Sequence, residues 1–230
     1  MDIDQLMLDI AGNLRAVKDR IAAAARRSGR EPEEIALVAV TKKFGARQIR
    51  EAAAAGVTDI GENYVQEATA KWLEIGPAVR WHFIGHLQRN KVKAAVEIFD
   101  MVQSVDSVEL AQELGRRSVA AGKTLDALIE VNVSQEATKF GVQRSEVPDL
   151  ASRIASIGGL RVQGLMGMAP YFDDPEQARP HFASLKELFD RLPDEQRAWL
   201  SMGMTQDFEI AIEEGSNMVR IGTAIFGPRG

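Results

Sequence analysis

Two adjacent lysines, Lys42 and Lys43, directly follow an apolar run with the length of a strand, Leu37-Val-Ala-Val-Thr41. A strand of this composition is expected to be buried on both faces, as in a parallel sheet. Partial burial favours the neutral form of an amine, which can then form a Schiff base with an aldehyde. Because side chains alternate along a strand, only one of the two lysines can face such a site. Spacing does not choose between them, and a pair of solvated loop lysines is the plainer alternative.

A second group of candidates lies near the C-terminus, in the run Val219-Arg-Ile-Gly-Thr-Ala-Ile-Phe-Gly227. The run combines a short strand, a Gly-Thr turn and a short helical segment. Glycine at position 222 lets backbone N–H groups approach an anion, and the hydroxyl of Thr223 adds a donor. Ser201 and Gly203 follow the preceding apolar run and could complete the same cup. These residues predict a phosphate site, with an ordinary turn as the alternative.

The other polar residues form no recognisable metal or hydrolytic site. His82 and His86 lie four apart in a run that reads as a strand, where this spacing does not bring side chains together on a metal as it does on a helix. The spacing supports no Ser-His-Asp arrangement. The chain has no cysteine, which excludes disulfides, thiolate nucleophiles and cysteine-ligated zinc. We therefore expect no metal and assign no catalytic residue.

The elements that must position these residues alternate regularly along the chain. An opening helix is predicted from about Asp4 to Arg27, because apolar residues recur there at helical spacing. Eight apolar runs of strand length follow, separated by amphipathic segments, some of which end at a glycine (Gly56, Gly122 and Gly215). The runs are Ile35–Val40, Val57–Ile60, Trp81–Ile84, Met101–Val105, Leu128–Val133, Val162–Met166, Trp199–Met202 and Met218–Ile221.

Strands that alternate with helices form a parallel sheet, and eight such units are what a closed (β/α)8 barrel requires. The predicted fold class is therefore an α/β barrel of the TIM type with an extra N-terminal helix. An open doubly wound sheet is the alternative, but the chain lacks a GxGxxG turn after its first strand. In a barrel, functional residues lie where strands end and the following loops begin. This rule places Lys42, Asn63, Ser201 and Gly222 on one rim.

Length and composition narrow the classes of protein and partner. The chain has 230 residues, 45% of them hydrophobic, which suits one barrel domain over residues 1–230. A net charge of -5 argues against a nucleic-acid partner. The longest stretch without a charged residue, Val162 to Phe172, is too short to span a membrane. The acidic N-terminus does not resemble a secretory signal, so we expect a cytoplasmic protein.

More specific patterns are carried by longer segments, namely Leu37-Val-Ala-Val-Thr-Lys42, Gly61-Glu-Asn-Tyr-Val-Gln-Glu67, Trp81-His-Phe-Ile-Gly-His-Leu-Gln88, Leu200-Ser-Met-Gly-Met-Thr-Gln-Asp-Phe208 and Gly215-Ser-Asn-Met-Val-Arg220 with the Ile-Gly-Thr-Ala-Ile-Phe-Gly that follows. In this order they resemble the pyridoxal phosphate homeostasis protein family, whose members are single-domain relatives of the alanine racemase N-terminal barrel. The resemblance extends from the opening helix to Gly227. It implies a fold-type III barrel that holds pyridoxal 5'-phosphate (PLP) as an internal aldimine on Lys42, which favours Lys42 over Lys43.

The resemblance also implies roles for other positions of this sequence. Ser201, Gly222 and Thr223 would bind the phosphate, Arg220 would face the pyridine nitrogen, and Asn63 would lie near the ring. An arginine cannot accept the proton of that nitrogen, so the ring would be a weaker electron sink than with an aspartate partner. Lys139 matches a lysine that the family links to a second, looser interaction with the cofactor.

The implied function is vitamin B6 homeostasis, in which the protein buffers PLP or delivers it to apo-forms of PLP enzymes. The related racemases have a second, β-rich domain that supplies a tyrosine acid/base, and we expect no such domain here, since the sequence runs only to Gly230. Racemisation needs acid/base groups on both faces of the substrate carbon, and the sequence offers no second group. An amino-acid racemase or another PLP enzyme with small activity is one alternative. A barrel aldolase, whose lysine would react directly with a sugar phosphate, is another.

Overall fold

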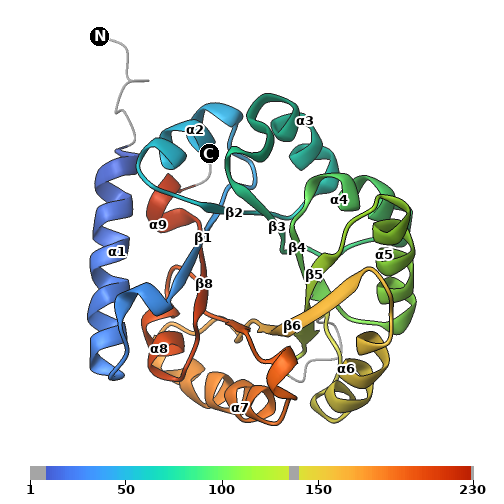
Figure 1. Cartoon of the computed structure of the whole chain (residues 1–230). Coiled ribbons are helices and arrows are strands. Elements are labelled where there is room, and N and C mark those ends of the chain that lie inside the picture. Colours follow the sequence, from blue (N-terminus) through green and yellow to red (C-terminus); the bar gives the residue numbers. More distant parts are fainter. Residues whose placement is uncertain (1–8, 135–139, 229–230) are drawn as a thin grey trace.

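Eight parallel strands, one at each apolar run of the sequence, form a closed barrel in the computed structural model, which describes residues 9–134 and 140–228 (Figure 1). Each strand pairs with the next along the chain, and β8 pairs with β1 to close the ring. The predicted barrel is therefore confirmed, and the open sheet is excluded. The strands are β1 (Ala36–Val40), β2 (Asp59–Glu62), β3 (Arg80–Phe83), β4 (Met101–Val105), β5 (Leu125–Val131), β6 (Leu160–Gly167), β7 (Trp199–Ser201) and β8 (Met218–Ile221).

Helices surround this barrel, and glycine ends several of them as the sequence predicts. Gly56, Gly122 and Gly215 all have positive φ angles, the backbone conformation that follows many helices and that glycine adopts without strain. Together with short 3₁₀ turns, the helices cover the outer face of the sheet. They are α2 (Ala46–Ala54), α3 (Val65–Ile75), α4 (Val92–Ile98), α5 (Val108–Ala120), α6 (Val147–Ala155), α7 (Arg179–Asp190), α8 (Phe208–Glu213) and α9 (Thr223–Phe226).

The extra N-terminal helix, α1 (Ile10–Arg27), lies beside α8 and α9, next to the place where the last strand meets the first (Figure 1). The carboxylate of Asp9 caps it by accepting a hydrogen bond from the N–H of Gly12. The Asn13 amide donates to the carbonyl of Ile225, at 3.0 Å. The prediction placed the start of this helix at Asp4, and the residues before Asp9 lie outside the described part of the chain.

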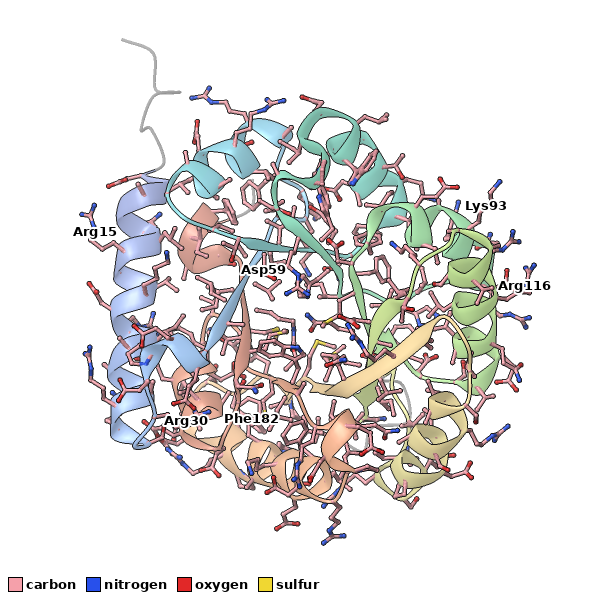
Figure 2. All side chains as sticks on the ribbon, in the orientation of Figure 1. Arg15, Arg30, Asp59, Lys93, Arg116 and Phe182 are labelled. Carbon is pink, nitrogen blue, oxygen red and sulfur yellow. The ribbon has the colours of Figure 1, made fainter. Side chains whose placement is uncertain are left out.

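The core has two parts, because a barrel buries both faces of its sheet. The larger part lies between the strands and the helices. On the opposite, outer side of the helices, charged side chains such as Arg15, Lys93 and Arg116 project away from the barrel (Figure 2). A smaller apolar cluster is made by five residues of the strands, Val38, Met101, Leu128, Met166 and Met218. Polar side chains are also buried among the strands, notably His82, Gln103 and Ser201. Neither stretch 9–134 nor stretch 140–228 contains a helix that is long and apolar enough to cross a membrane.

Candidate functional site

A cavity of about 710 Å³ opens among the residues that follow the strands, at the rim where the barrel rule expects function. This volume lies within the usual range for small-molecule sites. Five of the six residues predicted from the sequence line it, namely Lys42, Asn63, Arg220, Gly222 and Thr223. They come from β8, from the loops that follow β1, β2 and β8, and from the start of α9, so positions far apart in the sequence meet at one place.

Lys42 and Lys43 lie in different environments. Lys42 is half-buried and lines the cavity, whereas Lys43 is exposed. The backbone of Lys43 has a φ of 69°, an uncommon left-handed conformation for a residue other than glycine. Its N–H donates to the carboxylate of Glu67, which holds the turn in this form. The turn therefore directs one lysine of the pair toward the cavity and the other away from it.

A buried ion cluster supports this turn from below. The ammonium of Lys71 donates to the Thr41 carbonyl at 2.8 Å, to Glu62 Oε1 at 2.6 Å and to Glu67 Oε1 at 2.7 Å. Burial raises the pKa of Glu62 despite the nearby Lys71. One lysine thus joins Thr41, the residue before Lys42, to β2 and α3. No spacing pattern in the sequence predicts this cluster.

Arg220 enters the cavity from β8 and is almost fully buried. Its guanidinium donates to the hydroxyl of Ser201 at 2.6 Å and to the carbonyl of Gly167 at 3.0 Å. Burial lowers the pKa of Arg220 to about 10, although Glu130 and Asp207 oppose this shift, so the group stays charged at neutral pH.

Ser201 does not line the cavity, which differs from the predicted phosphate cup. Its side chain is fully buried at the end of β7, where it accepts from Arg220 and donates to Gln103. The difference arises from strand alternation and layering, since Ser201 points into the barrel one layer below the rim. Gly203, two residues later, has a φ of 94° and lies so close to α8 that an added Cβ would be 2.6 Å from the Ala211 Cβ. Gly203 is therefore needed for the conformation and close packing of the turn between β7 and α8.

Asn63 carries an unsatisfied polar atom at the cavity. Its Oδ1 is buried and has no hydrogen-bond partner among the described residues. Buried polar atoms are nearly always paired, so an unpaired one beside a cavity fits a bound ligand. Gly85 packs against the Asn63 backbone so closely that an added Cβ would lie 2.4 Å from its carbonyl oxygen. Glycine at that position thus lets the loops after β2 and β3 meet.

Gly222 leaves space at the cavity wall. Its φ of -115° is accessible to any residue, and an added Cβ would lie 3.4 Å from the Cβ of Val40, an ordinary contact. The backbone therefore does not require glycine here, and the missing side chain keeps the turn open toward the cavity. Thr223 follows as the first residue of α9, and the first N–H groups of a helix have no partner within it.

Sequence reasoning missed several residues of the cavity wall, above all Glu130 in β5. Burial, with a contribution from Asp106, raises the pKa of Glu130 to about 7, and Arg220 acts in the opposite direction. A carboxylate inside the apolar run Leu-Ile-Glu-Val was the signal that could have found it. Thr205 and Asp207 also line the cavity, as do the exposed apolar side chains Phe140, Met168, Tyr171 and Met204.

Two further predictions concern groups away from this cavity. The described ranges contain no cluster of three or more His, Asp or Glu side chains that could hold a metal ion. His82 contacts Asp59 and Gln103 inside the barrel, and His86 lies 3.6 Å from Asp106. Lys139, which the family resemblance singled out, lies outside the described residues.

Comparison with known proteins identifies the relatives of this chain. Residues 12–230 match the family described as the N-terminal domain of alanine racemase. The chain is 44% identical to the pyridoxal phosphate homeostasis protein of Escherichia coli K12, over 97% of this chain and 98% of that protein. PipY of Synechococcus elongatus PCC7942, in a structure with PLP bound, has 34% identity and a TM-score of 0.79, over 95% of this chain and 100% of PipY. Alanine racemase of Bartonella henselae shares the fold, with a TM-score of 0.72 at 14% identity over 95% of this chain and 58% of the racemase.

The raised pKa of Glu130 predicts a pH-dependent effect of the substitution Glu130→Gln. The folded protein binds this proton more tightly than the unfolded chain does, so the wild type loses stability as the pH rises from about 4.5 to about 7. We expect the variant to be more stable than wild type above about pH 7, by up to roughly 3 kcal/mol at ~1.4 kcal/mol per pKa unit.

Urea unfolding of the cofactor-free proteins at about pH 4 and about pH 8 measures the difference, which should nearly vanish at the lower pH. Glu97→Gln, on the exposed face of α4, is the matched control. A constant difference between Glu130→Gln and wild type at both pH values would contradict the assignment.

Proposed function

The chain belongs to the family of the alanine racemase N-terminal domain, and on this basis we propose that it binds PLP through Lys42 and serves PLP homeostasis. One observation carries the proposal: a single cavity is lined by a half-buried lysine, a buried arginine and a glycine turn. Aldehyde, ring nitrogen and phosphate are three of the polar groups of PLP, which also has a ring hydroxyl. Each has a chemically suitable neighbour in this cavity.

The proposed roles follow the strands that supply each residue. Lys42, after β1, holds the aldehyde carbon as an internal aldimine, and Arg220 in β8 donates to the pyridine nitrogen. Gly222 and Thr223 offer N–H and hydroxyl donors to the phosphate. Asn63 lies near the ring, where its unpaired oxygen supports a polar contact. Ser201 contributes through Arg220, since its hydroxyl faces that side chain and not the cavity.

Several features favour storage and transfer of the cofactor over catalysis. A guanidinium donor leaves the pyridine nitrogen without a proton, which weakens the ring as an electron sink. Binding on a lysine shields the aldehyde from other amines, while exchange with an incoming amine allows release. The homeostasis name borne by relatives agrees with such a role. Apo-forms of PLP enzymes are the proposed recipients.

A PLP enzyme of small activity, such as an amino-acid racemase, is the second candidate. Glu130 and Tyr171 both line the cavity, and either could exchange a proton with a bound amino acid. The pKa of Glu130, about 7, suits a general acid or base at neutral pH. An aldolase that uses Lys42 without PLP would be a colourless protein, so the visible spectrum separates it from both PLP-binding candidates.

The assignment of Lys42 predicts the effect of removing either lysine. Lys42→Ala should abolish the aldimine absorbance of the PLP-loaded protein, because no other amine is proposed to reach the aldehyde. The far-UV circular dichroism should stay native, since Lys42 lies outside the strands. Lys43→Ala is the matched control and should retain the absorbance. Borohydride reduction and peptide mapping identify the trapped lysine, and trapping on Lys43 would refute the assignment.

The phosphate role of Gly222 predicts a ligand-dependent loss of affinity. Gly222→Val should weaken PLP binding by about tenfold or more, because charge-assisted hydrogen bonds contribute about 1.5–3 kcal/mol each. Binding of pyridoxal, which lacks the phosphate, should change far less. Gly222→Ala provides a graded control, since its Cβ has an ordinary contact with Val40. Equal losses for both ligands would show that the turn does not bind the phosphate.

The homeostasis role predicts transfer of cofactor without appreciable turnover. Loaded protein mixed with the apo-form of a PLP enzyme should restore the activity of that enzyme. Exchange of the α-hydrogen of amino acids for deuterium should be far slower than about 1 per second, the low end of ordinary enzyme turnover. Rapid exchange or racemisation that is lost in Glu130→Gln would instead establish the second candidate.

A further inference from the structure

A chain of hydrogen-bonded side chains runs through the inside of the barrel from Arg220 to Asp59. Arg220 contacts the Ser201 hydroxyl at 2.6 Å, and that hydroxyl contacts Gln103 Oε1, also at 2.6 Å. Gln103 Nε2 lies 2.9 Å from His82 Nδ1, and His82 Nε2 lies 2.9 Å from Asp59 Oδ1. The cavity rim is thereby linked to the first residue of β2, which lies within the ring of helices in Figure 2.

The chemistry of these groups fixes the direction of every bond in the chain. A guanidinium only donates, so Ser201 accepts from Arg220 and must place its own proton on Gln103 Oε1. The Gln103 amide is then oriented with Nε2 toward His82 Nδ1, which must accept. The remaining proton of the imidazole is on Nε2 and points to the Asp59 carboxylate. His82 is therefore neutral, with its proton on Nε2.

Two contacts at the sides of the chain agree with this direction. Gln103 Nε2 also lies 3.2 Å from the sulfur of Met218, and a thioether can only accept. At the far end, burial raises the pKa of Asp59, but hydrogen bonds from His82 and Thr58 are among the interactions that lower it, and the net pKa is below its usual value. Asp59 is thus a carboxylate, the strongest terminal acceptor the chain could have.

The direction cannot reverse locally. A proton on His82 Nδ1 would require Gln103 to turn its oxygen toward the imidazole and its NH₂ group toward Ser201. The Ser201 hydroxyl would then receive two donors and would have to find a new acceptor for its own proton. Such mismatches are costly among fully buried groups. The state of His82 and the contact between Ser201 and Arg220 are therefore coupled.

We propose that Asp59, His82 and Gln103 are positioning residues, which hold the Ser201 hydroxyl as an acceptor and so aim Arg220 at the ring nitrogen of the cofactor. This inference rests on the proposed function, in which Arg220 donates to that nitrogen. It adds a requirement that the cavity alone does not reveal: three residues that never touch the ligand determine how strongly its ring nitrogen is bound.

The first test measures the histidine directly in cofactor-free protein. The chain has three histidines, so two-dimensional ¹⁵N–¹H correlation of the imidazole nitrogens is tractable, and the His82 signals are those absent from His82→Asn. Near neutral pH, His82 should be neutral with its proton on Nε2. A proton on Nδ1 in the wild-type protein would overturn the proposal, whether or not PLP binds.

The second test compares PLP with its 1-deaza analogue, in which carbon replaces the ring nitrogen. Wild type should prefer PLP by about tenfold, the effect of one hydrogen bond from a charged donor. Gln103→Met removes both bonds of the amide at similar volume and should abolish most of this preference. Met101→Leu, in the same barrel interior, is the matched control and should keep it.

A variant pair at the far end covers the case in which Gln103→Met does not fold. Asp59→Leu removes the terminal acceptor and should lower the preference for PLP, whereas Asp59→Asn keeps an acceptor oxygen and should restore it. General destabilisation would weaken both ligands alike and leave their ratio unchanged.

The outcomes separate the two proposals. If wild type binds both ligands equally, the role of Arg220 in the proposed function fails. If wild type prefers PLP and the preference survives in both Gln103→Met and Asp59→Leu, the positioning role alone fails.

Discussion

A guanidinium enclosed by a barrel is the constraint on which the rest of the site depends. Arg220 cannot accept a hydrogen bond, so every group that faces it must present an oxygen or remain open to a ligand. The Gly167 carbonyl and Ser201 hydroxyl meet this demand from β6 and β7, and Glu130 and Asp207 counter its charge from nearby. Its burial also dictates polar neighbours deeper in the barrel, where apolar side chains would otherwise pack.

Closure of the barrel brings residues from the two ends of the sequence next to each other. β8 pairs with β1, so the turn at Gly222 follows one strand of the seam and Lys42 follows the other. Lys42 is then positioned by the left-handed turn at Lys43 and by the buried ammonium of Lys71, which donates to the Thr41 carbonyl. Topology brings the two loops together, and side-chain hydrogen bonds set their final shape. Neither alone would bring Lys42 and Gly222 to the wall of one cavity.

Much of the fold could be predicted, because strands and helices leave a periodic pattern of apolar residues in the sequence. Less of the site could be predicted, because site residues follow no such period. Apolar runs such as Met101–Val105 coincide with the observed strands, since burial on both faces requires continuous hydrophobicity. The rule that functional residues follow the strands likewise predicted that Lys42 lies at the cavity. Ser201 differed because the strand rule gives the end of the barrel but not the depth of each side chain. Glu130 was missed because its apolar run was interpreted only as a strand, and Gln103 was missed because its partners, His82 and Ser201, lie on other strands.

The pairing of β1 with β8 affects when, during synthesis, a ligand site can form. The loops that would hold a ligand's two ends belong to the first and last strands, and α1 lies outside the same seam against α8 and α9. During synthesis, a chain that has made β1 to β7 presents the amine but neither Arg220 nor the glycine turn. Only a closed barrel could bind a ligand at both of its ends. A bound ligand would in turn stabilise the closed barrel by mass action. Occupancy would therefore report that translation and folding of the whole ring are complete.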